Sequence, residues 1–182
     1  MNQSDVSITR WAESEISHAL LNDLTDIFFA ASGTQQFASA AVKAAFRERW
    51  LGSYLSVNPN ETFIAVGSDG RAAGYLVGAL DDPATDPRHA ALGYFHNFAP
   101  WTARYPAHLH INIAARYRSA GIGARLIETF AALARSYGAP VMQVVTGQGM
   151  RNVGFYMRNG FETIADAPWN SGTVVMLGRK LR

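Results

Sequence analysis

The stretch Arg118-Ser119-Ala120-Gly121-Ile122-Gly123-Ala124 joins an apolar segment to a long amphipathic one. The spacing of apolar residues predicts a strand before this stretch and a helix after it. Glycines two positions apart let a ligand come close to the backbone, and the first turn of a helix offers unpaired N–H groups and the positive end of its dipole. Together with the guanidinium of Arg118, these groups suit the oxygens of a pyrophosphate.

Two other phosphate-binding loops fit this stretch less well. The P-loop of nucleotide triphosphatases has Lys and then Ser or Thr after its last glycine, whereas Gly123 is followed by Ala124 and Arg125. The dinucleotide-binding fingerprint has a third glycine, and Leu126 stands at that position. The remaining pattern, Arg-x-x-Gly-x-Gly after an apolar strand, resembles the phosphate loop of the GNAT superfamily of CoA-dependent N-acyltransferases.

A second motif downstream supports the same resemblance. Residues 152–161, Asn-Val-Gly-Phe-Tyr-Met-Arg-Asn-Gly-Phe, are similar to the superfamily's Phe-Tyr-x-x-x-Gly-Phe element, a short helix that turns through glycine into a strand. The resemblance covers residues 105–182. The local sequences of residues 105–111 and 175–179 also resemble the acetyltransferase-like C-terminal domain of O-GlcNAcase and its free-standing bacterial relatives.

The resemblance implies the architecture of the chain. We expect a mixed α/β (α+β) fold of GNAT type in a single domain over residues 1–182. Its central, mostly antiparallel sheet would have about six to seven strands, splayed at the cofactor site and flanked by about four helices. Nothing in the sequence suggests a repeat, a low-complexity tract or a linker to a second domain.

Composition limits the classes of partner. The formal net charge is +2 with a pI near 9.1, so no basic field predicts a nucleic-acid partner. The sequence has no cysteine, which fits a reducing compartment. Residues 1–5 are polar, and no apolar run approaches the roughly 18 residues of a membrane span. We therefore expect a soluble cytoplasmic protein, a monomer or homodimer, with no nucleic-acid or membrane partner.

Apolar periodicity and turn residues predict the individual elements. The Asp-Gly of residues 68–71 predicts a hairpin between two antiparallel strands. Expected strands are 6–11, 62–66, 73–77, 108–113, 141–146 and 173–177, and expected helices are 16–28, 42–54 and 122–137.

The segment 81–106 does not follow these patterns. It holds four of the seven prolines and five aromatic residues. A loop of this length inside a compact domain is usually functional or mobile. Two interpretations stay open: a lid over the acceptor site, or an ordered surface excursion that packs its own aromatic side chains, for example at a dimer interface.

The resemblance assigns the residues that hold acetyl-CoA, the expected cosubstrate. The pyrophosphate would lie against Arg118, Ser119, Ala120, Gly121, Ile122, Gly123 and Ala124, and the pantetheine amides would pair with the backbone of Ile111, Asn112 and Ile113. Asn152 is one helical turn before Tyr156 and could reach CoA from the same helix face. Many relatives carry this asparagine seven residues before the tyrosine, where this sequence has Gly149.

Two residues are candidates for proton transfer. Tyr156 matches the family tyrosine that hydrogen-bonds the CoA sulfur and can donate a proton to it; the alternative is a tyrosine of the core. His110 is the first choice for a general base, because imidazole titrates near neutral pH. His108, His110 and Asn112 alternate on one face of their strand, directed toward the cleft or toward the covering helices. The His-x-His spacing lacks a third ligand, so we expect no metal.

The sequence thus predicts an acetyl-CoA-dependent N-acetyltransferase. The acceptor amine, whose identity the sequence does not indicate, would attack the thioester directly in a ternary complex. The alternative is a module that binds acetyl-CoA without acceptor chemistry, since no general base stands out clearly.

Overall fold

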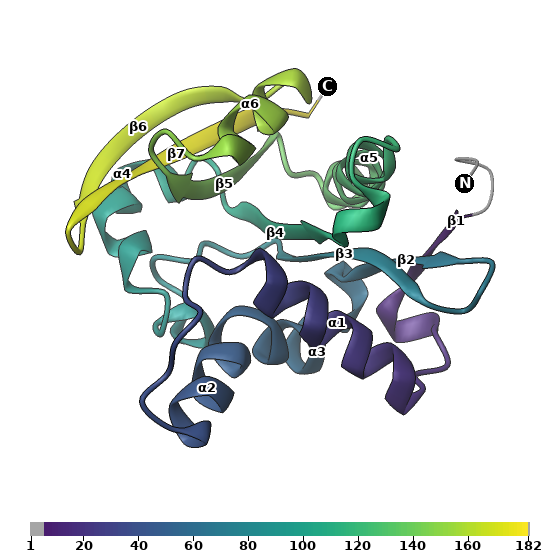
Figure 1. The fold of residues 1–182 in the computed structure, drawn as a ribbon. Helices are drawn as coiled ribbons and strands as arrows, with labels where there is room; N and C mark the ends of the chain where they lie inside the picture. Colours follow the sequence, from purple (N-terminus) through teal and green to yellow (C-terminus); the bar gives the residue numbers. More distant parts are fainter. Residues whose placement is uncertain (1–5, 182) are drawn as a thin grey trace. The chain divides into compact units, whose positions relative to one another are not determined.

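The structure is a computed structural model that describes residues 6–181. The polar residues 1–5 lie outside the described residues. Seven strands form one sheet in the order β1-β2-β3-β4-β5-β7-β6, mostly antiparallel, which confirms the predicted fold class (Figure 1). The strands are β1 (Val6–Arg10), β2 (Phe63–Gly67), β3 (Ala72–Ala79), β4 (Ala107–Ile113), β5 (Val141–Gly147), β6 (Glu162–Trp169) and β7 (Gly172–Lys180).

Helices occupy most of the predicted positions. They are α1 (His18–Ala31), α2 (Ala40–Arg47), α3 (Ser53–Val57), α4 (Ala99–Thr102), α5 (Ile122–Ser136) and α6 (Arg151–Arg158). The predicted helix 42–54 is divided, because a π-helical turn η3 (Glu48–Gly52) lies between α2 and α3. None of the helices in residues 6–181 combines the length and the apolar character that crossing a membrane requires.

The described chain forms two compact units. The first comprises residues 6–78 and 110–130, and the second comprises 79–109 and 131–181. The strand β4 contributes its last four residues to the first unit and its first three to the second. The single domain over residues 1–182 stays a prediction.

The first unit is built on the antiparallel strands β1, β2 and β3. Residue pairs run from Val6↔Gly67 to Arg10↔Phe63 between β1 and β2. The hairpin between β2 and β3 turns at Gly70, whose φ of 73° lies in the left-handed region that glycine adopts without strain. This confirms the hairpin predicted from Asp69 and Gly70. In Figure 1, α1, α2 and α3 lie on one side of β2 and β3. The buried side chains of this unit include Leu24 and Phe28 of α1, Leu51 of η3 and Tyr54 of α3. Ile64 of β2 and Leu76 of β3 are buried as well.

One ion pair fixes helix α1 to this hairpin. Asp23 is 7% exposed, and both of its carboxylate oxygens accept hydrogen bonds from Arg71 at the start of β3. The same carboxylate accepts a hydrogen bond from the backbone N–H of Ala72 at 3.0 Å. The hydrogen bond from Arg71 holds the pKa of Asp23 below its ordinary value, although burial opposes this shift.

The second unit contains the strands β5, β6 and β7 and the first residues of β4. The pairing of β4 with β5 is parallel and includes Ala107↔Met142 and His108↔Gln143. Strands β5 and β7 pair antiparallel from Val141↔Lys180 to Gly147↔Val174. The helix α6 and the strand β6 that follows it have the order that the Phe-Tyr-x-x-x-Gly-Phe resemblance implies, with Gly160 at a φ of 81° between them.

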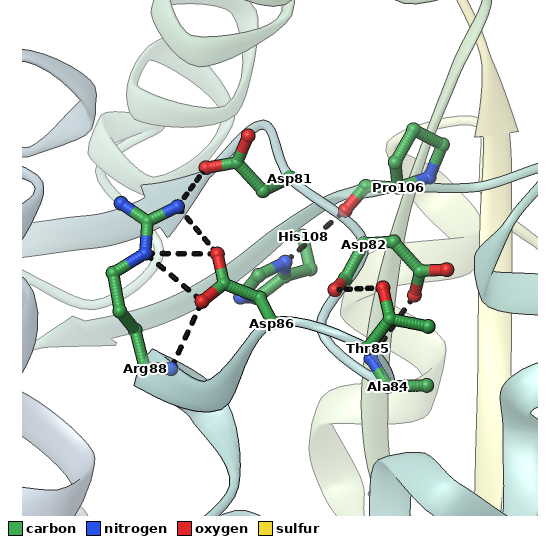
Figure 2. A network of polar contacts seen from close by, with 8 residues as sticks. All are labelled: Asp81, Asp82, Ala84, Thr85, Asp86, Arg88, Pro106 and His108. Atoms are coloured by element: carbon green, nitrogen blue, oxygen red, sulfur yellow. Dashed lines mark hydrogen bonds and ion pairs between the residues drawn. The ribbon is translucent and has the colours of Figure 1, made fainter.

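The segment 81–106 also belongs to this unit, and it is ordered. Its turns are η5 (Pro87–His89) and η6 (Gly93–Phe98), followed by α4. Arg88 forms ion pairs with Asp81 and Asp86, and these pairs hold residues 81–88 at the beginning of the segment together (Figure 2). Tyr94 packs on Trp169 of β6 with ring centroids 5.8 Å apart, and its neighbours Phe95 and Phe98 are buried as well. Within the segment, the rings of Tyr94 and Phe95 and those of Phe98 and Trp101 also contact each other, so the segment packs aromatic side chains of its own. Its role as a lid stays a prediction.

The Asp23–Arg71 pair generates a test of the fold. Asp23→Asn should lower the free energy of unfolding by about 1–3 kcal/mol, because it removes a charged acceptor from a buried position. Since the pKa of Asp23 is lowered, its carboxylate stabilises the fold above the ordinary value of 3.8, and this contribution disappears as the pH falls through the folded-state pKa. Denaturant unfolding at pH 7 and at decreasing pH measures both effects.

The matched control is Asp26→Asn, which changes an exposed carboxylate on the same helix. It should alter stability by less than about 0.5 kcal/mol. Equal losses in the two variants, or a gap that widens in acid, would contradict the assignment.

Candidate functional site

The turn between β4 and α5 has the backbone of an anion site. We call residues 118–124 the phosphate cradle. Ser119 has a φ of 64° and Gly121 a φ of 74°, so left-handed residues stand on both sides of Ala120. Backbone of alternating hand turns successive N–H groups toward one side and forms an anion-binding concavity. Both left-handed residues are exposed to solvent.

The start of α5 adds further donors to the cradle. The N–H of Arg125 donates to the carbonyl of Gly121 at 3.1 Å, which is the first bond of the helix. The N–H groups of Ile122, Gly123 and Ala124 therefore precede any helical acceptor and can meet a ligand. A helix of 15 residues also directs the positive end of its dipole there. The side chain of Ile122, 1% exposed, fixes this first turn in the core.

Arg118 supplies the permanent charge of the cradle. Its side chain is exposed, and its Nε donates to the carbonyl of Ile113 at 3.3 Å. This hydrogen bond ties the guanidinium to the end of β4, at the entrance of the loop. Arg116, by contrast, is an exposed surface charge: its guanidinium lies over the ring of Tyr117 and 3.9 Å from the carboxylate of Asp69.

The residues predicted to pair with pantetheine form the last part of β4. Ile111, Asn112 and Ile113 are all half-buried. Asn112 donates from Nδ2 to the hydroxyl of Tyr75 at 2.8 Å, so its side chain is held by β3. Gly74 allows this approach, because a Cβ there would lie 2.8 Å from the carbonyl oxygen of Asn112. These contacts hold the last part of β4 against β3. The pairing of residues 111–113 with pantetheine stays a prediction.

His110 lies among aromatic rings of the covering helices. Its ring centroid is 5.3 Å from that of Trp50 in η3 and 5.6 Å from that of Tyr54 in α3, and both contacts are edge-on. Of the two directions left open by the sequence, the structure shows the one toward the helices. Trp50 and Tyr54 were not predicted as site residues, because their four-residue spacing is also that of an ordinary core stripe.

Tyr156 and Asn152 lie on α6, in the second unit. Tyr156 is 3% exposed and packs against Phe155 and Phe161, with ring centroids 5.3 and 5.5 Å away. Burial raises the pKa of Tyr156, so its hydroxyl stays protonated at neutral pH. Asn152 is exposed, and its Oδ1 accepts a hydrogen bond from Thr146 at 3.0 Å. The cradle, residues 111–113 and His110 are together in the first unit.

Comparison with known proteins identifies the family. The family model described as "Acetyltransferase (GNAT) family" matches residues 17–161. The chain belongs to this family, whose members transfer acetyl groups and generally use acetyl-CoA. The narrower resemblance to the O-GlcNAcase domain stays a prediction.

Solved structures share the fold at low sequence identity. SsHAT is 21% identical with a TM-score of 0.75, and 98% of this chain and 99% of that chain are covered. PH1933 from Pyrococcus horikoshii OT3 is 15% identical with a TM-score of 0.70 and the same coverage. The NatC complex bound to Gag peptide and CoA is 14% identical, with a TM-score of 0.65 over 98% and 99% of the two chains.

The geometry of the cradle generates a test of ligand binding. Gly121→Asp should abolish binding of acetyl-CoA, because it places a carboxylate among donors arranged for an anion. For the unchanged protein, acetyl-CoA at about 100 times its Kd should stabilise the fold by roughly 2.7 kcal/mol. Calorimetric titration and thermal unfolding with and without ligand measure the two quantities.

The control is Gly138→Asp, which introduces the same charge at a φ of 79° and in open space. Both variants bear a similar backbone strain, since their φ values differ little. Gly138→Asp should keep the ligand-induced stabilisation. If Gly121→Asp binds acetyl-CoA as tightly as Gly138→Asp does, the cradle is not the phosphate site.

Proposed function

We propose that the protein is an acetyl-CoA-dependent N-acetyltransferase in which an amine acceptor attacks the thioester directly within a ternary complex. The observation that carries this proposal is the cradle, with left-handed backbone at Ser119 and Gly121 immediately before a long helix. Backbone of this kind is suited to anion binding, and its sequence resembles the phosphate loop of the family. The acceptor's chemical identity, a cytoplasmic location and a monomeric or homodimeric state stay predictions.

The residues of the cradle fit the diphosphate part of the cosubstrate. The N–H groups of residues 120–124 and the guanidinium of Arg118 are the proposed donors. The backbone of residues 111–113 is assigned to the pantetheine amides, and Asn152 to a further polar contact. When bound, acetyl-CoA supplies an acetyl group activated as a thioester.

His110 is proposed to take the proton of the acceptor ammonium. An amine attacks only in its neutral form, so a group that titrates near neutral pH is suited to this task. The edges of Trp50 and Tyr54 restrict rotation of the imidazole and so keep it oriented. Transfer can be direct or through one water molecule.

Tyr156 is proposed to act on the leaving sulfur. In the proposed transfer, His110 first takes one proton from the acceptor ammonium, and the neutral amine nitrogen then bonds to the acetyl carbon as the carbon–sulfur bond breaks. The second proton that the nitrogen loses goes to the leaving sulfur, to which the Tyr156 hydroxyl donates a hydrogen bond, so the products are the acetamide and the CoA thiol. The raised pKa of Tyr156 keeps the phenol a donor at neutral pH, and it also makes full proton transfer harder. A hydrogen bond to the thiolate is therefore its main expected contribution.

One observation favours a second candidate, a module that binds acetyl-CoA without transferring it. Tyr156 is packed between two phenylalanines as a core tyrosine would be. A screen of amines for acetyl-dependent release of CoA distinguishes the two functions. Release with any amine supports the enzyme, whereas tight acetyl-CoA binding with no release across protein, peptide, small-amine and amino-sugar acceptors supports the module.

Removal of one hydroxyl tests the role of Tyr156. Tyr156→Phe should keep acetyl-CoA affinity, since the ring still packs, and should lower turnover about 10²-fold, equal to about 2.7 kcal/mol in the barrier. The matched variant Tyr137→Phe changes a side chain that is 69% exposed and should leave turnover unchanged. Full activity of Tyr156→Phe from pH 6 to pH 10 would remove Tyr156 from the mechanism.

The pH dependence of kcat/KM tests His110. The unchanged enzyme should lose activity in acid as the imidazole becomes protonated and stops accepting a proton. His110→Gln should be slow at neutral pH and should recover at high pH, where the acceptor amine is neutral without a base. His18→Gln, which changes an exposed histidine, should keep the original profile. An unaltered profile in His110→Gln would show that another group is the base.

A further inference from the structure

A fully buried amide on β5 lacks partners within the described chain. Gln143 is 0% exposed, and neither its Nε2 nor its Oε1 makes a hydrogen bond to any residue of 6–181. A carboxamide offers two donors and two acceptor lone pairs. To leave all of them unpaired in the interior is unfavourable, so a buried group of this kind calls for an explanation.

The sheet places two particular residues beside Gln143. His108 on β4 is opposite it in the parallel pairing, and Gly178 on β7 is opposite it in the antiparallel pairing. Directly opposite residues project from the same side of a sheet. His108 is 1% exposed, and its Nδ1–H donates to the carbonyl of Pro106 at 3.1 Å (Figure 2). In the neutral ring, Nε2 then carries the lone pair.

The segment 81–106 covers this part of the sheet. His89 lies perpendicular to His108 with ring centroids 4.5 Å apart, and Phe95 lies 5.1 Å from the same ring. Tyr105 lies on Gly178, since a Cβ at that glycine would be 2.7 Å from the tyrosine ring. The amide of Gln143 is therefore enclosed between the sheet and side chains of the segment.

We propose that Gln143 binds an internal water molecule between β5 and the segment 81–106. The ligand has to donate and accept hydrogen bonds at once, and it has to fit a place closed to solvent. An ion is unsuited, because burial of a charge without an opposite charge is very costly. Internal waters typically make about three hydrogen bonds to buried polar groups that lack other partners.

The electrostatics of the site agree with an uncharged ligand. Burial lowers the pKa of His89, so this imidazole is neutral at neutral pH. The nearest charged groups on the segment, Asp81, Asp86 and Arg88, are bound to one another at its exposed beginning (Figure 2). The water would thus join the segment to the sheet through neutral groups.

Nuclear Overhauser spectroscopy of the full chain tests this site with water itself as the probe. The side-chain amide of Gln143, assigned by its loss in Gln143→Met, should show a cross-peak to water with the sign of a long-lived contact. The control Gln148→Met removes an exposed amide next to the end of the same strand and should keep that cross-peak. The unchanged protein suffices for the measurement should Gln143→Met fail to fold.

A crystal structure supplies the second readout. It should show an ordered water within about 2.7–3.2 Å of Oε1 or Nε2 of Gln143. A long-lived cross-peak together with this water supports the site. The absence of the cross-peak, or an amide of Gln143 that hydrogen-bonds only protein groups, overturns it.

Discussion

The left-handed backbone between β4 and α5 is the constraint on which the account of this protein depends. A residue with positive φ costs little at Gly121 and more at Ser119, so the loop accepts some strain. That backbone conformation places the N–H groups of two consecutive regions, the loop and the first helical turn, next to one another, where we propose that the pyrophosphate binds. The buried side chain of Ile122 keeps this arrangement rigid, because the helix cannot rotate without leaving the core.

Close backbone approaches position the remaining parts of each unit. Gly74 lets β3 meet the carbonyl of Asn112, and Gly178 lets the ring of Tyr105 lie on β7. In both cases a single methyl group would collide with the neighbouring atoms. The approach at Gly74 holds β4, whose residues 111–113 are assigned to the cosubstrate, against β3. The approach at Gly178 lets the ring of Tyr105 cover the sheet beside Gln143. Both contacts therefore require glycine at these positions.

Local patterns in the sequence were enough to predict much of this fold. The Asp-Gly turn of Gly70 and the apolar stripe of α5 depend on short-range geometry, and the structure confirms both. The phosphate cradle could be predicted for the same reason, since its glycines and Arg118 are close together in the sequence. Its binding of a phosphate stays a prediction. The π-helical turn at Glu48–Gly52 has no comparable signal, and it divided the predicted helix.

Contacts between distant segments were beyond such patterns. Trp50 and Tyr54 contact His110 only because the helices fold onto β4, and their spacing alone indicates a core stripe. Gln143 stood within a strand predicted as buried, but its lack of partners depends on what the segment 81–106 places above it. The turns of that segment, η5 and η6, are short and aperiodic. Their contacts are tertiary: His89 of η5 packs on His108 of β4, and Tyr94 of η6 packs on Trp169 of β6.

Backbone amide spectra recorded during an acetyl-CoA titration test the central claim most directly. The account predicts that the amide resonances of Ser119 to Ala124 shift most, in proportion to ligand bound, because these N–H groups donate to the pyrophosphate. Shifts that occur elsewhere while these resonances stay in place, or no shift at saturating acetyl-CoA, would contradict it.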